Sequence, residues 1–128
     1  MNGNRFLLDT NCIINLLNGT SKDLILNLEK AEWIGISIIS QLEFLSFPDL
    51  SESDRILFKR FSECITVIGL AENNSELLNQ VINIRIQKNL KLPDCIILAT
   101  AKYTNSILLT QDKKLLSSND ENVIAIDY

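Results

Sequence analysis

The chain has 128 residues, of which 46% are apolar, with four Gly and two Pro. This composition fits one globular domain and excludes disordered, collagen-like and linker-rich proteins. The absence of His excludes catalytic triads, imidazole general bases, haem ligation by His and His-bound zinc. A net charge of −4 counts against binding nucleic acid through charge alone. We expect one domain over residues 1–128.

The cysteines and the lengths of the apolar runs indicate the cellular compartment of the protein. Cys12, Cys64 and Cys95 are unevenly spaced, form no CxxC pair and each stand in an apolar run. An odd number of such residues favours buried, reduced thiols over a disulfide framework or a zinc site. No targeting segment is visible, and no apolar stretch approaches the ~18 residues of a membrane-spanning helix. We therefore expect a cytoplasmic protein.

The first part of the chain alternates predicted strands and helices. Apolar β-rich runs predict the strands, and capping residues with helical periodicity predict the helices. Thr20 is placed to cap the second helix, and Ser40 with Glu43 has the spacing of a capping box at the start of the third. The predicted elements are a strand at 5–8, helices at 10–17 and 21–31, a strand at 33–39, and a helix from 40 that ends before Pro48.

The second part continues the same alternation. The helix that begins at Pro93 is apolar almost all round, so we expect it to be buried. Strands that alternate with helices predict a mainly parallel sheet with helices on both faces. The predicted elements are helices at 51–64, 72–88 and 93–102, strands at 65–68, 107–110 and 123–126, and a helical turn at 113–116.

Four carboxylates are predicted to lie at one edge of this sheet. Asp9 and Asp112 follow strands, while Glu43 and Asp94 stand at predicted helix starts that reach the same edge. Ligand sites of open parallel sheets lie beyond the carboxyl ends of their strands. Taken alone, each acid is better explained as a helix cap or a partner of a helix dipole, and only the four together at one edge favour a ligand site.

Clustered carboxylates repel one another and therefore bind cations or protons. Oxygen ligands without His or Cys select hard cations such as Mg²⁺ or Mn²⁺, which assist phosphodiester hydrolysis. With the four acids set aside, 12 acids balance 12 bases in the rest of the chain. Basic side chains that would contact phosphate, or simply form solvated surface, are Lys59, Arg60, Lys88, Lys91, Lys113 and Lys114.

The same motifs carry a family resemblance. They are Leu8 to Asn11, Ser40 to Glu43, Leu92 to Asp94 with the apolar run Ile96 to Ala101, and Leu109 to Asp112. In their order and spacing the chain resembles the PIN-domain ribonucleases, especially the small bacterial VapC-like toxins of toxin–antitoxin modules. The resemblance covers nearly the whole chain.

The resemblance implies a three-layer α/β/α domain, Mg²⁺- or Mn²⁺-dependent endoribonuclease activity and a homodimer inhibited by a small antitoxin. It assigns metal ligation and water activation to Asp9, Glu43, Asp94 and Asp112. Asn11 and Thr110 match polar positions that orient a ligand or water; an early-helix hydrogen bond and a strand-end hydroxyl explain them equally well.

Several other interpretations remain open at this stage. The helix at 10–17 has more apolar surface than one stripe needs, which either a partner or deeper burial accounts for. Arg85 is expected to pack its stem and pair its head with an acid, and Asp120 to be a loop residue. A catalytically inactive binding module and a phosphatase or phosphoacceptor domain are alternatives, although Asn11 replaces the second acid of an Asp-x-Asp motif.

Overall fold

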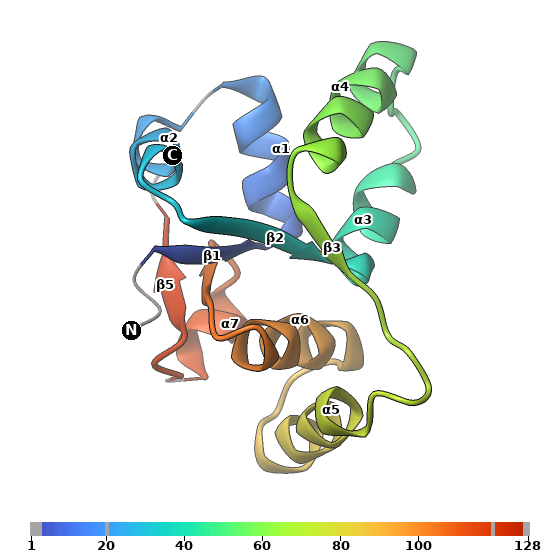
Figure 1. The fold of residues 1–128 in the computed structure, drawn as a ribbon, viewed down its shortest axis with the longest axis vertical. Helices are drawn as coiled ribbons and strands as arrows, with labels where there is room; N and C mark the ends of the chain where they lie inside the picture. The colour runs from blue at the N-terminus through green and yellow to red at the C-terminus, as the bar shows by residue number, and fades with distance from the viewer. Residues whose placement is uncertain (1–3, 20, 119, 127–128) are drawn as a thin grey trace.

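The computed structural model describes residues 4–19, 21–118 and 120–126 and contains one five-stranded sheet, in the order β3-β2-β1-β4-β5 (Figure 1). All its neighbouring strands pair in parallel. The strands are β1 (Arg5–Leu8), β2 (Trp33–Ser37), β3 (Thr66–Ile68), β4 (Ile107–Thr110) and β5 (Val123–Ala125). The predicted mainly parallel sheet is confirmed.

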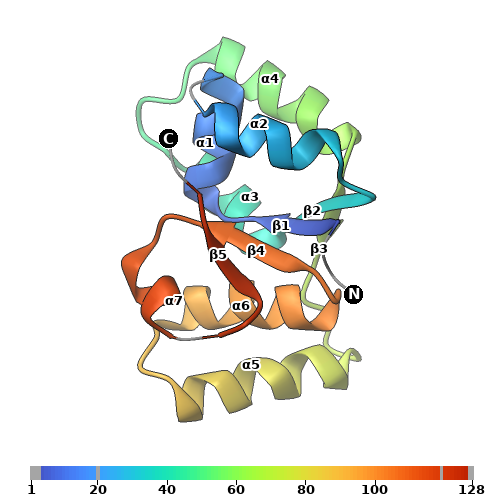
Figure 2. The same cartoon turned by 90° about the vertical axis from the view of Figure 1, so that its left-hand side faces the viewer.

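Helices cover both faces of the sheet, as the side view in Figure 2 shows. One layer holds α1 (Thr10–Asn18), α2 (Lys22–Glu29), α3 (Ile38–Leu45) and α4 (Glu52–Glu63). The other holds α5 (Ser75–Gln87), α6 (Leu92–Tyr103) and α7 (Lys113–Ser117). Within that layer α6 packs on the sheet and α5 packs on the outer side of α6. The predicted three-layer α/β/α architecture is confirmed.

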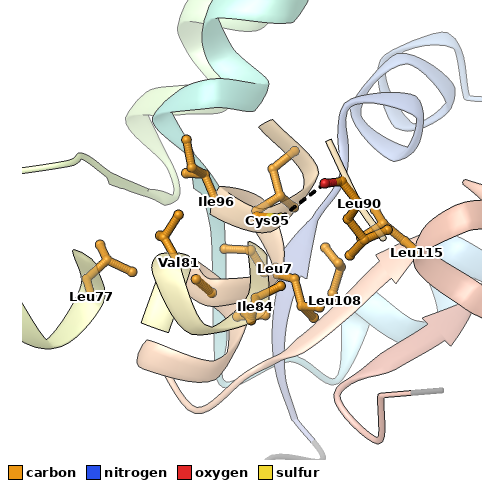
Figure 3. Close-up of a cluster of buried hydrophobic side chains, with 13 residues drawn as sticks. Leu7, Leu77, Val81, Ile84, Leu90, Cys95, Ile96, Leu108 and Leu115 are labelled. Carbon is orange, nitrogen blue, oxygen red and sulfur yellow. Dashed lines mark hydrogen bonds between the residues drawn. The ribbon is translucent and has the colours of Figure 1, made fainter. Parts of the chain in front are cut away.

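Two hydrophobic cores result from the alternation of side chains along the strands. Leu7 of β1 belongs to the core beneath α5 and α6, while Phe6 and Leu8 belong to the core beneath α1 to α4. Figure 3 shows the first core, which α6 fills from Cys95 to Ala101. The prediction that this helix is buried is confirmed.

The start of α3 differs from the prediction. Its cap is Ser37, whose hydroxyl accepts a hydrogen bond from the backbone N–H of Ile39 at 3.1 Å, so the capping box predicted for Ser40 and Glu43 is wrong. Ser37 is also the last residue of β2 that pairs with β3. Because the ladder ends there, the two apolar residues that follow, Ile38 and Ile39, continue as helix instead of strand.

Two other helix starts also move. Ser21 caps α2 by accepting a hydrogen bond from the backbone N–H of Leu24 at 3.1 Å, whereas the sequence predicts a cap at Thr20. Thr20 itself lies outside the described residues. Asn74 caps α5 through its side chain, so this helix begins three residues later than predicted. In both helices the residue directly before the first helical residue is the cap, and its side chain accepts a hydrogen bond from one of the first backbone N–H groups of the helix.

The cysteines agree with the sequence in two of three cases. Cys12 and Cys95 are buried and form no disulfide, but Cys64 is exposed, because it ends α4 at the surface of the domain. The expectation that all three are buried is therefore wrong for Cys64. Among the described residues, no helix is both long and apolar enough to span a bilayer.

Candidate active site

The four predicted acids lie around the carboxyl edge of the sheet. Asp9 directly follows β1 and caps α1, and Asp112 follows β4 and caps α7. Glu43 is in the second turn of α3, the helix that follows β2, instead of at its start. Asp94 is in the first turn of α6, and Figure 2 shows this end of α6 near α7.

Two threonine hydroxyls connect three of these acids. Thr10 donates from Oγ1 to Oε1 of Glu43 at 2.8 Å, and Thr110 donates from Oγ1 to Oδ2 of Asp9 at 2.6 Å. The Thr110 oxygen also accepts the backbone N–H of Asp112 at 2.9 Å. Since Thr10 immediately follows Asp9, a single hydrogen-bonded chain runs from Glu43 to Asp112. These bonds fix how the carboxylates of Asp9 and Glu43 point.

Electrostatics add Asp94 to the same group. The pKa of Asp94 is raised to about 6, first by burial and then by the negative charges of Asp112, Asp9 and Glu43. The nearby charge of Lys91 lowers it only slightly. Burial also raises the pKa of Asp9, against hydrogen bonds from Thr110 and Thr10 and together with the charges of Asp112 and Glu43. The four acids are therefore close enough to destabilise one another's ionised forms.

Helix capping explains only part of this arrangement. Asp9 accepts the backbone N–H of Thr10 at 2.8 Å, and Asp112 accepts those of Lys114 and Leu115 at 2.9 and 3.1 Å. Glu43 is inside its helix, where no cap is needed. Asp94 makes no capping bond, and its carboxylate accepts no hydrogen bond from the part of the chain described. The cap interpretation holds for two of the four acids and fails for the other two.

The donor set suits a hard divalent cation. It consists of carboxylates, without a nitrogen or sulfur ligand, and its mutual repulsion is what a cation would relieve. Across residues 4–19, 21–118 and 120–126, no three Cys, Asp or Glu side chains lie together in an arrangement that could hold a metal ion by themselves. Mg²⁺ does not need such a cage, because it keeps several waters and is held by one or two carboxylates with substrate phosphates.

The predicted supporting residues separate into one that contacts the acids and one that does not. Thr110 is buried and bonds Asp9, as described above. Asn11 is exposed on α1, and its side chain forms no hydrogen bond to a described residue. Sequence analysis missed Thr10, whose hydroxyl holds Glu43. The available signal was a hydroxyl directly after Asp9 at the first position of a helix.

The remaining candidates lie outside the acidic group. Arg85 donates to the backbone carbonyl of Leu90, so the expected pairing with an acid is wrong: the nearest acceptor is a main-chain oxygen. Asp120 forms an ion pair with Lys102 at 2.8 Å. Burial alone would raise the pKa of Asp120, but Lys102 and the Asn122 N–H together lower it.

Comparison with known proteins places these features in a family. A sequence model of the PIN domain matches residues 6–121. A toxin–antitoxin complex from Klebsiella pneumoniae contains a chain of 25% identity and TM-score 0.76, matched over 92% of this chain and 94% of that one. VapBC2 from Rickettsia felis, bound to a DNA fragment from its promoter, gives 20% identity, TM-score 0.71 and coverage of 96% and 98%. FitAcB from Neisseria gonorrhoeae contains a chain of 20% identity and TM-score 0.64, matched over 95% of this chain and 96% of that one. A search among curated proteins found no match.

Proposed function

The chain belongs to the PIN-domain family, and we propose that it is a Mg²⁺- or Mn²⁺-dependent endoribonuclease acting through Asp9, Glu43, Asp94 and Asp112. The family supports a nuclease, and the acid group supports a metal mechanism. One observation carries the proposal: Asp94 faces three other acids, and its pKa is raised to about 6. A site that concentrates negative charge in this way requires a cation before it approaches a phosphodiester.

The chain's own residues divide the work of such a site. A bound divalent ion lowers the pKa of its water and stabilises charge on the attacking and leaving oxygens. Asp9 and Glu43 are the ligands whose direction is fixed, because Thr110 and Thr10 donate to them. Asp94 accepts no hydrogen bond from the described residues and has a pKa of about 6 without metal, so a cation and a proton would compete for its carboxylate near neutral pH.

Cleavage of a fluorescently labelled single-stranded RNA tests this proposal. We expect cleavage with Mg²⁺ or Mn²⁺, none in EDTA, and recovery when the metal is restored. The matched control is Asp94→Asn, purified identically, which keeps the shape of the side chain but is a poorer ligand. Full activity in EDTA with verified metal-free buffer would rule out the metal mechanism. A folded protein that cleaves no RNA with either metal would favour the inactive binding module.

We also propose that the protein is the toxin of a toxin–antitoxin module and forms a homodimer. The support from the structure is an apolar groove of about 200 Å³ between α1 and the α3–α4 region. Ile14 and Leu17 of α1 line it, and Phe47, which is 40% exposed, lies opposite. The excess apolar surface predicted for the first helix is thus only partly buried. A small antitoxin that covers this groove would account for it.

The antitoxin proposal is tested with the product of a short reading frame next to the gene. We expect the two purified proteins to form a complex and RNA cleavage to stop. Phe47→Ser should weaken the complex while cleavage by the free protein is retained, since the Phe47 side chain lies beyond the end of α3, is exposed and packs on the ring of Phe44. Sedimentation of the protein alone should give the mass of a dimer, and a monomer would contradict that part.

A further inference from the structure

A second cleft lies between the α5–α6 connection and α7 and has a volume of about 420 Å³. Its lining contains two ammonium groups, several neutral polar side chains and no acid, in a chain with more acids than bases. The lining residues are Gln87, Lys88, Asn89, Leu90, Lys114, Ser117 and Ser118. This cleft is therefore the electrostatic opposite of the acidic group described above.

Both walls of the cleft lead directly to the candidate active site. Lys114 is two residues after Asp112, a span of at most ~7 Å along the chain. The other wall ends at Leu90, four residues before Asp94. In Figure 2 the α5–α6 connection and α7 lie on the same side of the molecule, where the first turn of α6 begins. A ligand bound in the cleft consequently extends toward the acids.

One ammonium group of the cleft is held by a hydrogen bond within the protein, and the other is available to a ligand. Lys88 donates from Nζ to the carbonyl of Ser118 at 2.9 Å, which ties its ammonium group across the cleft. Arg85 donates to the carbonyl of Leu90, so the main-chain oxygens of both walls already have cationic donors. The ammonium group of Lys114 has no partner among the residues described and is exposed.

Asp120, the acid whose pKa the charge of Lys88 lowers, does not cancel the charge of the cleft. Asp120 is 5% exposed and pairs with Lys102 at 2.8 Å, so its charge is already balanced. Lys88 adds to the positive charge around Asp120. The cleft therefore keeps a net positive charge. Ammonium and amide donors without a competing carboxylate are suited to anionic oxygens.

We propose that this cleft binds a backbone phosphate of the RNA strand next to the one that is cleaved, an inference that rests on the proposed nuclease function. The acids alone repel a polyanion, and a bound cation neutralises only the phosphate at the reaction centre. Lys88 and Lys114 supply attraction for the neighbouring phosphate. Because lysine contacts to phosphate carry no sequence information, the cleft contributes grip and position, and cleavage-site choice lies elsewhere.

The test compares two double variants of equal charge. Lys88→Gln with Lys114→Gln alters the cleft, while Lys22→Gln with Lys30→Gln alters exposed lysines at the two ends of α2, in the opposite helix layer. Binding of a labelled single-stranded oligodeoxynucleotide is measured by anisotropy at several salt concentrations with Mg²⁺ present. We expect the cleft variant to bind about tenfold more weakly, with a salt slope smaller by ~1.4, and the control pair to change little.

The outcomes separate the cleft from the nuclease proposal. Strand binding that depends on the two cleft lysines supports the cleft even if RNA is not cleaved, in which case only the nuclease proposal fails. If both double variants cleave RNA with the same KM and bind the strand with the same salt slope, the proposed phosphate-binding role of the cleft fails and the nuclease proposal stands. Lack of strand binding by the unaltered protein also overturns it. The single variant Lys114→Gln, whose ammonium group supports no structural contact, guards against misfolding and should lower the slope by ~0.7.

Discussion

Acidic side chains at the two ends of the parallel sheet have pKa values shifted in opposite directions. Near the amino end of β5, Asp120 is paired with Lys102 at 2.8 Å and its pKa is lowered. At the carboxyl end, Asp94 is only partly buried, yet its pKa rises to about 6 because burial and three neighbouring acids act together. Burial penalises both carboxylates, so the sign of the shift is decided by what faces them.

This difference separates a structural acid from one that needs a ligand. The chain supplies the counter-ion of Asp120 itself, and the pair connects α6 to the segment before β5. For Asp94 the chain supplies more negative charge and only a weak contribution from Lys91. A fold retains such unfavourable charge where something from outside compensates it, which is why perturbed acids mark functional sites.

The strongest way to break this comparison is to replace each acid by its amide and measure RNA cleavage. Asp94→Asn should reduce the rate by at least ~100-fold, because an amide is a poorer ligand for a hard cation and exchanges no proton. Asp120→Asn should leave the rate nearly unchanged. Single-turnover rates of the two variants, with circular dichroism to verify folding, provide the measurement. Similar losses of cleavage rate in both variants would show that the proposed position of the active site is wrong.

Melting temperatures measured without metal test the same difference between the acidic group and the paired Asp120. Asp9→Asn removes one charge from the acidic end, and its amide can still accept from the Thr10 N–H and donate to Thr110, so the variant should melt a few degrees higher in EDTA. Asp120→Asn leaves Lys102 without its counter-ion and should melt a few degrees lower.

Metal provides the control for that experiment. Mg²⁺ or Mn²⁺ should raise the melting temperature of the unaltered protein by mass action, and raise that of Asp9→Asn less. The response of Asp120→Asn should equal that of the unaltered protein. If all three respond alike, Asp9 is a helix cap without a role in cation binding.

The fold followed from the sequence because its signals were local and repeated. The strand at Ile107–Thr110 and the helix behind Pro93 were predicted from apolar runs and a helix-start residue, and both are confirmed. The start of α3 was not predictable. Ser37 and Ser40 are both good caps, and only the end of the ladder with β3 decides between them.

That the four acids lie around one edge of the sheet was predictable, but how they are held was not. Strand ends placed Asp9 and Asp112, since parallel strands finish at one edge. The hydroxyl of Thr10 reaches Glu43 across 33 residues of sequence, a contact that no local pattern encodes. Arg85 likewise finds a backbone carbonyl that only the packed structure brings near. Long-range contacts of single polar groups remain the part that sequence reasoning misses.

The pH dependence of stability should also differ between the two ends. Without metal, the folded protein holds the proton of Asp94 more tightly than the unfolded chain, so stability falls as pH rises from about 4 to about 6. Asp94→Asn should flatten this part of the curve. The lowered pKa of Asp120 acts in reverse: its stabilisation is present above pH ~4 and is lost as pH falls further.

Melting curves in EDTA between pH 3 and 7 check both parts. The difference between Asp94→Asn and the unaltered protein should develop above pH 4, and the difference for Asp120→Asn should disappear below it. Added Mg²⁺ should reduce the first difference only, because metal and protons compete for the same carboxylate. A curve for Asp94→Asn parallel to that of the unaltered protein would contradict the raised pKa.

The smallest predicted effect concerns two fully buried serines, one at each end. Ser106 bonds the hydroxyl of Thr104 at 2.8 Å, whereas the hydroxyl of Ser40, one turn before Glu43, has no hydrogen-bond partner in the described part of the chain. An unsatisfied buried hydroxyl costs ~1–3 kcal/mol, and Ala favours a helix. Ser40→Ala should therefore raise stability by about 1 kcal/mol, and Ser106→Ala should lower it by a similar amount. Denaturant unfolding measures both. Destabilisation by Ser40→Ala would show that an ordered water satisfies this hydroxyl, and a parallel loss of RNA cleavage would place that water in the active site.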